Sequence, residues 1–172
     1  PVIKASQNRS CVEVFTLSEE IWFKKFYKTL EINYKKEPYF CDVFESILNP
    51  WRGKTCGSKI SISEFNFIII SKICNYLDIQ TKLVSTSVGL TKNNFNLGLQ
   101  DIVRNFNGDH YINSIGGKEL YSKEDFREVG IKLNFIQMDD LEVENPYISI
   151  LDLLFKYDKE YIKTQLEKYT LV

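Results

Sequence analysis

Two polar segments hold the side chains best suited to bind a ligand, and each follows a predicted β-strand. Ligands of open α/β sheets bind beyond the carboxyl ends of the strands, so these segments are where a site is expected. The candidates after the predicted strand Lys82–Ser85 are Ser87, Asn93 and Asn94. The candidates after the predicted strand His110–Ile112 are Asn113, Ser114, Gly116, Gly117 and Tyr121. Amides and hydroxyls bond polar ligands, and glycines let backbone N–H groups approach a phosphate or sugar closely.

These candidates also have simpler structural explanations. Gly116 and Gly117 fit a turn between two elements as well as they fit ligand contact. Asn93 and Asn94 precede a predicted helix, and capping of that helix explains them better than a ligand does. Neither segment matches the phosphate-binding patterns G-x-x-x-x-G-K-[ST] or G-x-G-x-x-G, so the sequence predicts no cofactor.

Catalytic groups are harder to assign than binding groups. His110 is the only histidine of the chain, and Asp109 beside it would orient a general base if both faced the same way. Neighbours on a strand point to opposite faces, which favours a structural or surface histidine. Asp152 is a candidate carboxylate, but Ser149 precedes it at the spacing of a capping box, and the cap requires fewer assumptions. The catalytic residues therefore stay unassigned.

Composition excludes several classes of function. The 22 basic and 23 acidic side chains nearly cancel, so no strong field draws the chain to nucleic acid. The longest apolar runs fall far short of the roughly 20 residues that span a bilayer. The four cysteines show no C-x-x-C pair and only one histidine accompanies them, which argues against a metal site. Scattered cysteines without a signal sequence favour reduced thiols and a cytoplasmic location.

The N-terminal half is predicted to be mainly helical. Cys11–Phe15 alternates like a strand, and an amphipathic helix follows from Ser18 to about Tyr34. A second helix is expected between Pro38 and Pro50. The S-x-x-E spacing of Ser61–Glu64 predicts the capped start of a third helix that runs to about Leu77.

From Lys82 onward strands and helices alternate. The remaining predictions are helix 95–106, strand His110–Ile112, helix 123–129 ended by Gly130, strand Ile131–Ile136, a helix capped at Ser149, and a final helix capped at Asp158 with Ile162, Leu166 and Tyr169 inward. This order predicts an α/β fold, mainly a parallel sheet from βαβ units with helices on both faces, together with the helical N-terminal half and two C-terminal helices.

Taken as a set, several segments resemble the WbqC-like family, in matching order over nearly the whole chain. They are Leu30–Phe40, Ser63–Asn66, Asn93–Val103, Tyr111–Tyr121 and Ile148–Phe155. Members of that family usually begin with a strand and a Gln-Pro-containing loop that precede the segment starting here. The resemblance thus implies a single domain over residues 1–172 that is N-terminally incomplete, with an unpaired sheet edge where the strand belonged.

The resemblance implies a pathway and not a reaction, because the family is associated with O-antigen and other bacterial surface polysaccharides. One hypothesis is an enzyme that modifies or transfers a nucleotide-activated sugar, or acylates an amino sugar. The alternative is a non-catalytic protein that organises a glycan-assembly complex and contacts its enzymes. In the first case the two strand-end loops would hold the nucleotide-sugar or glycan intermediate.

Overall fold

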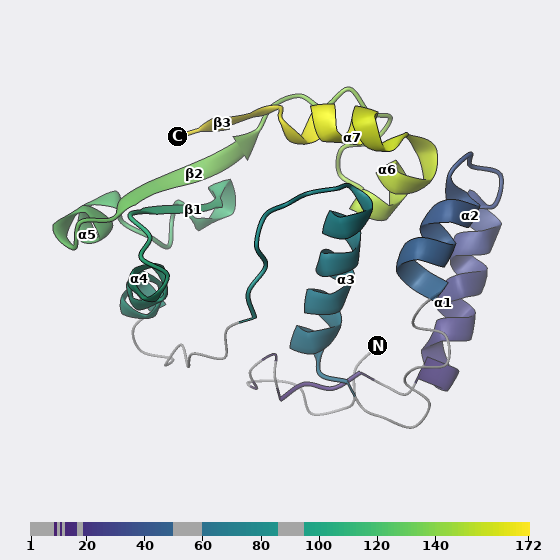
Figure 1. Cartoon of the computed structure of the whole chain (residues 1–172), viewed down its shortest axis with the longest axis horizontal. Helices are drawn as coiled ribbons and strands as arrows, with labels where there is room; N and C mark the ends of the chain where they lie inside the picture. The colour runs from purple at the N-terminus through teal and green to yellow at the C-terminus, as the bar shows by residue number, and fades with distance from the viewer. Residues whose placement is uncertain (1–8, 10, 12, 17–18, 50–59, 86–94) are drawn as a thin grey trace. The chain divides into compact units, whose positions relative to one another are not determined.

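The computed structural model describes residues 9, 11, 13–16, 19–49, 60–85 and 95–172. Over these residues the chain forms seven α-helices and one sheet of three strands (Figure 1). They fall into two units. The helical unit comprises residues 1–85 and 143–164, and the sheet unit comprises residues 86–142 and 165–172. The mixed α/β class predicted from the sequence is confirmed.

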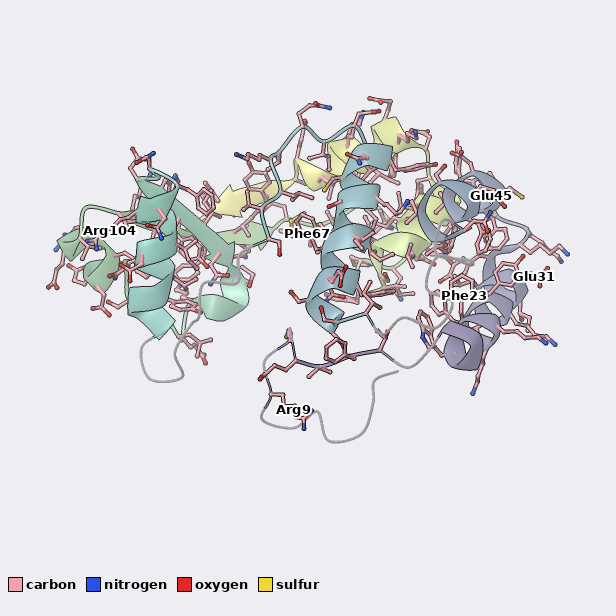
Figure 2. All side chains as sticks on the ribbon, turned by 60° about the horizontal axis from the view of Figure 1, so that its bottom comes forward. Arg9, Phe23, Glu31, Glu45, Phe67 and Arg104 are labelled. Carbon is pink, nitrogen blue, oxygen red and sulfur yellow. The ribbon has the colours of Figure 1, made fainter. Side chains whose placement is uncertain are left out.

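The helical unit begins with α1, whose bounds match the predicted amphipathic helix. Its elements are α1 (Glu19–Tyr34), α2 (Phe40–Val43), the π-helical turn η1 (Phe44–Leu48), α3 (Ile62–Tyr76), α6 (Ile150–Lys156) and most of α7 (Lys159–Leu166). On α1, Phe23 is buried. The Glu31 carboxylate lies 3.5 Å from Nζ of Lys35, one turn further along the chain. Figure 2 labels Phe23 and Glu31. The apolar stripe of this helix therefore faces inward, as its spacing requires.

Side-chain caps start four helices where the sequence predicts them. The hydroxyl of Ser61 accepts a hydrogen bond from the Glu64 N–H at 3.2 Å. Those of Ser122 and Ser149 accept from backbone N–H groups at 3.4 Å each. Asp158 accepts from the Tyr161 N–H at 2.7 Å. These bonds satisfy N–H groups that the first turn of a helix leaves without partners.

The core of the helical unit joins the early helices to the two C-terminal helices. Val43 and Ile47 are fully buried together with Leu154 and Phe155, and Ile162 of α7 belongs to the same cluster. The rings of Phe40 and Phe155 lie 5.3 Å apart between centroids. Residues separated by more than 100 positions in the sequence thus share one core. The inward position predicted for Ile162 is confirmed, whereas Leu166 and Tyr169, also predicted inward, are exposed.

The sheet unit contains three strands in the order β1-β2-β3. Its elements are α4 (Phe95–Asn105), β1 (His110–Ser114), the 3₁₀ turn η3 (Ile115–Gly117), α5 (Lys123–Glu128), β2 (Lys132–Met138) and β3 (Tyr169–Leu171). Strands β1 and β2 are parallel, with His110 opposite Lys132, whereas β3 is antiparallel to β2. The βαβ unit through α5 is confirmed, but "mainly parallel" overstates a sheet with one parallel and one antiparallel pair.

The prediction of helices on both faces is wrong within the sheet unit. Leu133 and Phe135 of β2 are buried against Phe126 of α5, with Leu99 and Val103 of α4 packed beside them. Both helices therefore cover the same face. The side chains that alternate to the other face remain exposed, and they include Ile112, Met138, Tyr169 and Leu171.

Three local predictions also need correction. Lys82–Ser85 is irregular and mostly exposed, and it pairs with no strand among the described residues. Within the described part of Cys11–Phe15, the structure contains one isolated bridge, between Phe15 and Ser61. The last helix ends at Leu166, and Tyr169 belongs to β3. Strand formation depends on a partner as well as on propensity, so short β-forming runs mislead when partners are unknown.

Candidate functional site

The candidate site lies where β1 ends and the chain turns back toward α5. Asn113 is the fourth residue of β1, the turn η3 follows at once, and Tyr121 precedes the Ser122 cap of α5. The parallel pairing of β1 with β2 places this connection at the carboxyl end of both strands. This is the end of a sheet at which ligands are expected.

Gly117 brings three predicted residues together. A Cβ added at Gly117 would lie 2.7 Å from the Asn113 side-chain nitrogen and 3.3 Å from Cδ2 of Tyr121. Gly117 is buried, whereas Asn113 and Tyr121 are only partly buried. The missing side chain is thus the reason that the amide and the phenol ring can approach the backbone so closely. Asn113, Gly117 and Tyr121 form one contact group.

Ser114 and Gly116 lie on the solvent side of the same turn. Both are exposed, and a Cβ at Gly116 would meet no atom within 4 Å. Gly116 therefore has no steric need to be glycine. The Ser114 N–H donates to the Asn113 side-chain oxygen at 2.8 Å, which fixes the amide with its nitrogen toward Gly117.

A cluster of aromatic rings supports this group from inside. The ring of Tyr111 stacks on Phe126 at 5.6 Å, and Tyr121 meets Phe126 edge-on at 6.5 Å. Burial raises the pKa of the Tyr111 hydroxyl, and the nearby Tyr121 raises it further. The shift extends the pH range over which this phenol keeps a hydrogen to donate. Sequence reasoning missed Tyr111, although it lies two residues before Asn113 and so faces the same way.

The second predicted segment contains three of the candidate residues. Ser87, Asn93 and Asn94 lie outside the described residues, so the meeting of two connections at one pocket stays a prediction. Lys82–Ser85, the strand expected before these residues, is irregular in the structure. The candidate site consists of residues from β1 to Tyr121.

His110 has a structural contact. Its Nε2 lies 2.9 Å from the Asn134 side-chain oxygen on the neighbouring strand, and Asn134 also donates to the Val172 carbonyl at 3.2 Å. The described residues show no contact between His110 and the Asp109 carboxylate. This arrangement agrees with a histidine that links strands.

Asp152 lies in a charged cluster in the helical unit and does not act as the predicted cap. The Ser149 hydroxyl caps α6, while the Asp152 carboxylate is almost fully buried and lies 3.3 Å from Nζ of Lys156. Lys156 also donates to the Glu144 carboxylate at 2.5 Å. The second oxygen of Asp152 has no hydrogen-bond partner among the described residues.

The cluster shifts the protonation of its members. Burial raises the pKa of the Tyr34 hydroxyl, and the interaction with Asp152 raises it further. The hydrogen bond to Glu144 raises the pKa of Lys156, burial opposes this, and Asp152 adds to it. A protonated phenol and an ammonium thus surround a buried carboxylate. The four-residue spacing of Asp152 and Lys156 is the sequence signal that could have suggested the pair.

Two further classes of site are absent from the described part of the chain. It contains no group of three or more His, Cys, Asp or Glu residues arranged to hold a metal ion. Its helices are also too short or too polar to cross a membrane. The described cysteines, Cys11, Cys41 and Cys74, are free thiols.

The fold and site define a mixed α/β protein whose candidate site is a glycine-containing turn at the end of a parallel strand pair. The model of the WbqC-like protein family matches residues 1–164, and the chain belongs to that family. No curated protein and no solved structure gives a match. Family membership confirms the resemblance read from the sequence.

Proposed function

We propose that the chain modifies or transfers an activated sugar, or acylates an amino sugar, in cytoplasmic steps of bacterial surface-polysaccharide (O-antigen) biosynthesis. The resemblance to the WbqC-like family suggests the pathway, and membership of that family is shown. The substrate class is a nucleotide-activated sugar. The single observation that supports a ligand site is the contact group of Asn113, Gly117 and Tyr121 at the end of β1.

The chemistry of this group suits a sugar. The Asn113 amide and the phenols of Tyr111 and Tyr121 supply hydrogen-bond donors and acceptors for ring hydroxyls. The aromatic rings supply apolar surface.

Calorimetry with a panel of UDP-, GDP- and dTDP-linked sugars tests the proposal. We expect at least one to bind, and binding to be lost in Gly117→Val, whose side chain would displace Asn113 and Tyr121. Asn113→Ala and Ser114→Ala remove one polar group each without overpacking. Gly116→Ala is the matched control, because its side chain enters open space and leaves the contact group in place.

The proposal fails if no member of the panel binds the wild-type chain. It also fails if a nucleotide-sugar binds equally well to the wild type, Gly117→Val and Asn113→Ala. Thermal unfolding of each variant separates loss of binding from loss of fold.

A second function, a non-catalytic role in organising a glycan-assembly complex, is favoured by the open face of the sheet. Ile112, Met138, Tyr169 and Leu171 are each 40–46% exposed on that face. Exposed apolar patches of this kind often mark protein interfaces. Co-expression with a glycosyltransferase of the same gene cluster tests this function: the pair should co-purify, and Ile112→Ser with Leu171→Ser should separate them. Gel filtration of the chain as an unaccompanied monomer would count against it.

A further inference from the structure

A cleft in the sheet unit lies at the opposite end of the strands from the candidate site. It has a volume of about 610 Å³, inside the range of roughly 300–1,000 Å³ typical of small-molecule sites. The polar residues that line it are Asp109, Lys123, Glu124, Arg127, Lys132 and Asn134. Lys132 pairs with His110 at the first position of the parallel ladder, whereas the candidate site follows its last position.

The charges of the cleft do not cancel. Its lining contains three cationic side chains and two carboxylates. Arg127 and Glu124 neutralise each other through a hydrogen-bonded ion pair along α5. Lys123 and Lys132 form no ion pair with any residue that the structure describes, and neither does Asp109. The cleft thus offers two uncompensated ammonium groups beside one free carboxylate.

The backbone around the cleft is held by hydrogen bonds. The Lys132 N–H donates to the Asp109 carbonyl at 2.8 Å, and the Ile131 N–H donates to the Phe126 carbonyl at 2.9 Å. Gly130, directly before Ile131, has a φ of 78°, in the left-handed region that favours glycine. Its N–H donates to the Arg127 carbonyl at 3.0 Å. A site fixed in this way loses little conformational freedom when a ligand binds.

We propose that this cleft binds a phosphorylated small molecule that also carries hydroxyl groups, such as a sugar phosphate. Two ammonium groups attract a dianionic phosphate as point charges. The Asp109 carboxylate accepts hydrogen bonds from hydroxyls and disfavours a second anionic group. A neutral sugar would leave both lysines unpaired, and a uronic acid, with one negative charge, would match one of them.

The site does not depend on the function proposed for the loop after β1. The two sites share no side chain, and the probes for the cleft contain no nucleotide. Binding of sugar phosphate at the cleft with no binding of nucleotide-sugar would refute the proposed function and leave this inference intact. Binding of nucleotide-sugar at the loop with no binding of sugar phosphate at the cleft would refute this inference and leave the proposed function intact.

NMR titration of the full chain with glucose 1-phosphate, glucose and glucuronate tests the inference. Glucose 1-phosphate should shift the backbone amides of Gly130 and Lys132 and bind more tightly than glucuronate, while glucose should cause no shift. Lys123→Gln combined with Lys132→Gln should weaken binding about tenfold, a modest effect because both lysines are exposed.

The matched control combines Lys28→Gln with Lys36→Gln. These lysines are exposed residues of the helical unit without a described ion pair, so the control removes the same net charge. It should bind glucose 1-phosphate like the wild type. An equal loss of affinity in the two double variants would overturn the inference. It would also be overturned if glucuronate or glucose bound the wild type as tightly as glucose 1-phosphate, or if the wild type did not bind glucose 1-phosphate. Thermal unfolding of the double variants checks that each is folded.

Discussion

The adjacent glycines of η3 should respond in opposite directions to the same substitution. Gly117→Ala places a methyl group 2.7 Å from the Asn113 side-chain nitrogen, closer than real Cβ contacts, so the amide must move. Overpacking of this kind costs about 1–3 kcal/mol. The low end applies if the amide rotates freely. The Asn113 oxygen, however, accepts a hydrogen bond from the Ser114 N–H, and its loss adds about 1 kcal/mol. We expect a total of about 2 kcal/mol.

Gly116→Ala should be neutral or stabilising. Its methyl group meets no atom within 4 Å, and Gly116 is not among the glycines with positive φ. Restricting the unfolded chain then favours the folded state by about 0.4–1 kcal/mol. The expected difference between the two variants is therefore about 2–3 kcal/mol.

Urea and thermal unfolding of the wild type and both variants measure this difference. A loss of 2 kcal/mol corresponds to roughly 4–8 °C in Tm for a chain of this size. Equal stability of the two variants would refute the reasoning, because it would mean that Asn113 and Tyr121 do not press on Gly117. The same result would remove the steric basis of the proposed site.

Two further predictions concern buried polar groups in the helical unit. Asp152→Asn should lower the free energy of unfolding by about 1–3 kcal/mol, because it leaves Lys156 without its buried partner. Glu144→Gln, at an exposed position, should lower it by less than about 1 kcal/mol. Equal losses of the two variants in urea unfolding would contradict this prediction. The Tyr76 hydroxyl donates to Asp42 at 2.6 Å, and burial followed by this bond raises its pKa well above the ordinary 10.0. Because the folded state holds this proton more tightly, the stabilisation is complete below pH 10 and is lost as pH rises above it, at up to about 1.4 kcal/mol per pH unit. Tyr76→Phe should flatten the alkaline decline seen in urea unfolding between pH 9 and 11, whereas Tyr147→Phe, at a 95% exposed position, should leave it unchanged.

The elements that could be predicted are those whose signals are local. Ser61, Ser122 and Asp158 begin helices because a side chain three residues from a free N–H satisfies it, and that spacing is visible in the sequence. Gly130 ends α5 for a similarly local reason, its positive φ. Exposed residues alternate with more buried ones along β1 and most of β2, and this period of two makes a strand predictable from local sequence.

The elements that could not be predicted depend on a distant partner. Strand β3 has three residues, all exposed, and exists because Leu171 and Tyr169 pair with β2 more than 30 residues earlier. Lys82–Ser85 has the composition of a strand and no strand partner among the described residues. Composition alone does not distinguish the two cases, because the ladder hydrogen bonds come from the other chain segment.

Local and distant partners also distinguish the two polar clusters described above, the contact group after β1 and the charged cluster around Asp152. Asn113, Gly117 and Tyr121 lie within nine residues of one another, so a strand end followed by a turn was enough to bring them together. The cluster of Tyr34 with Asp152 joins positions 118 residues apart, and it requires α1 and α6 to pack through Phe155 first. Local spacing therefore places the Asp152 carboxylate in a capping box with Ser149, whereas in the structure the Ser149 hydroxyl caps α6 and the carboxylate lies against Lys156. A charged side chain that is buried in a helix and does not cap it requires a distant partner, since burial without pairing costs several kcal/mol.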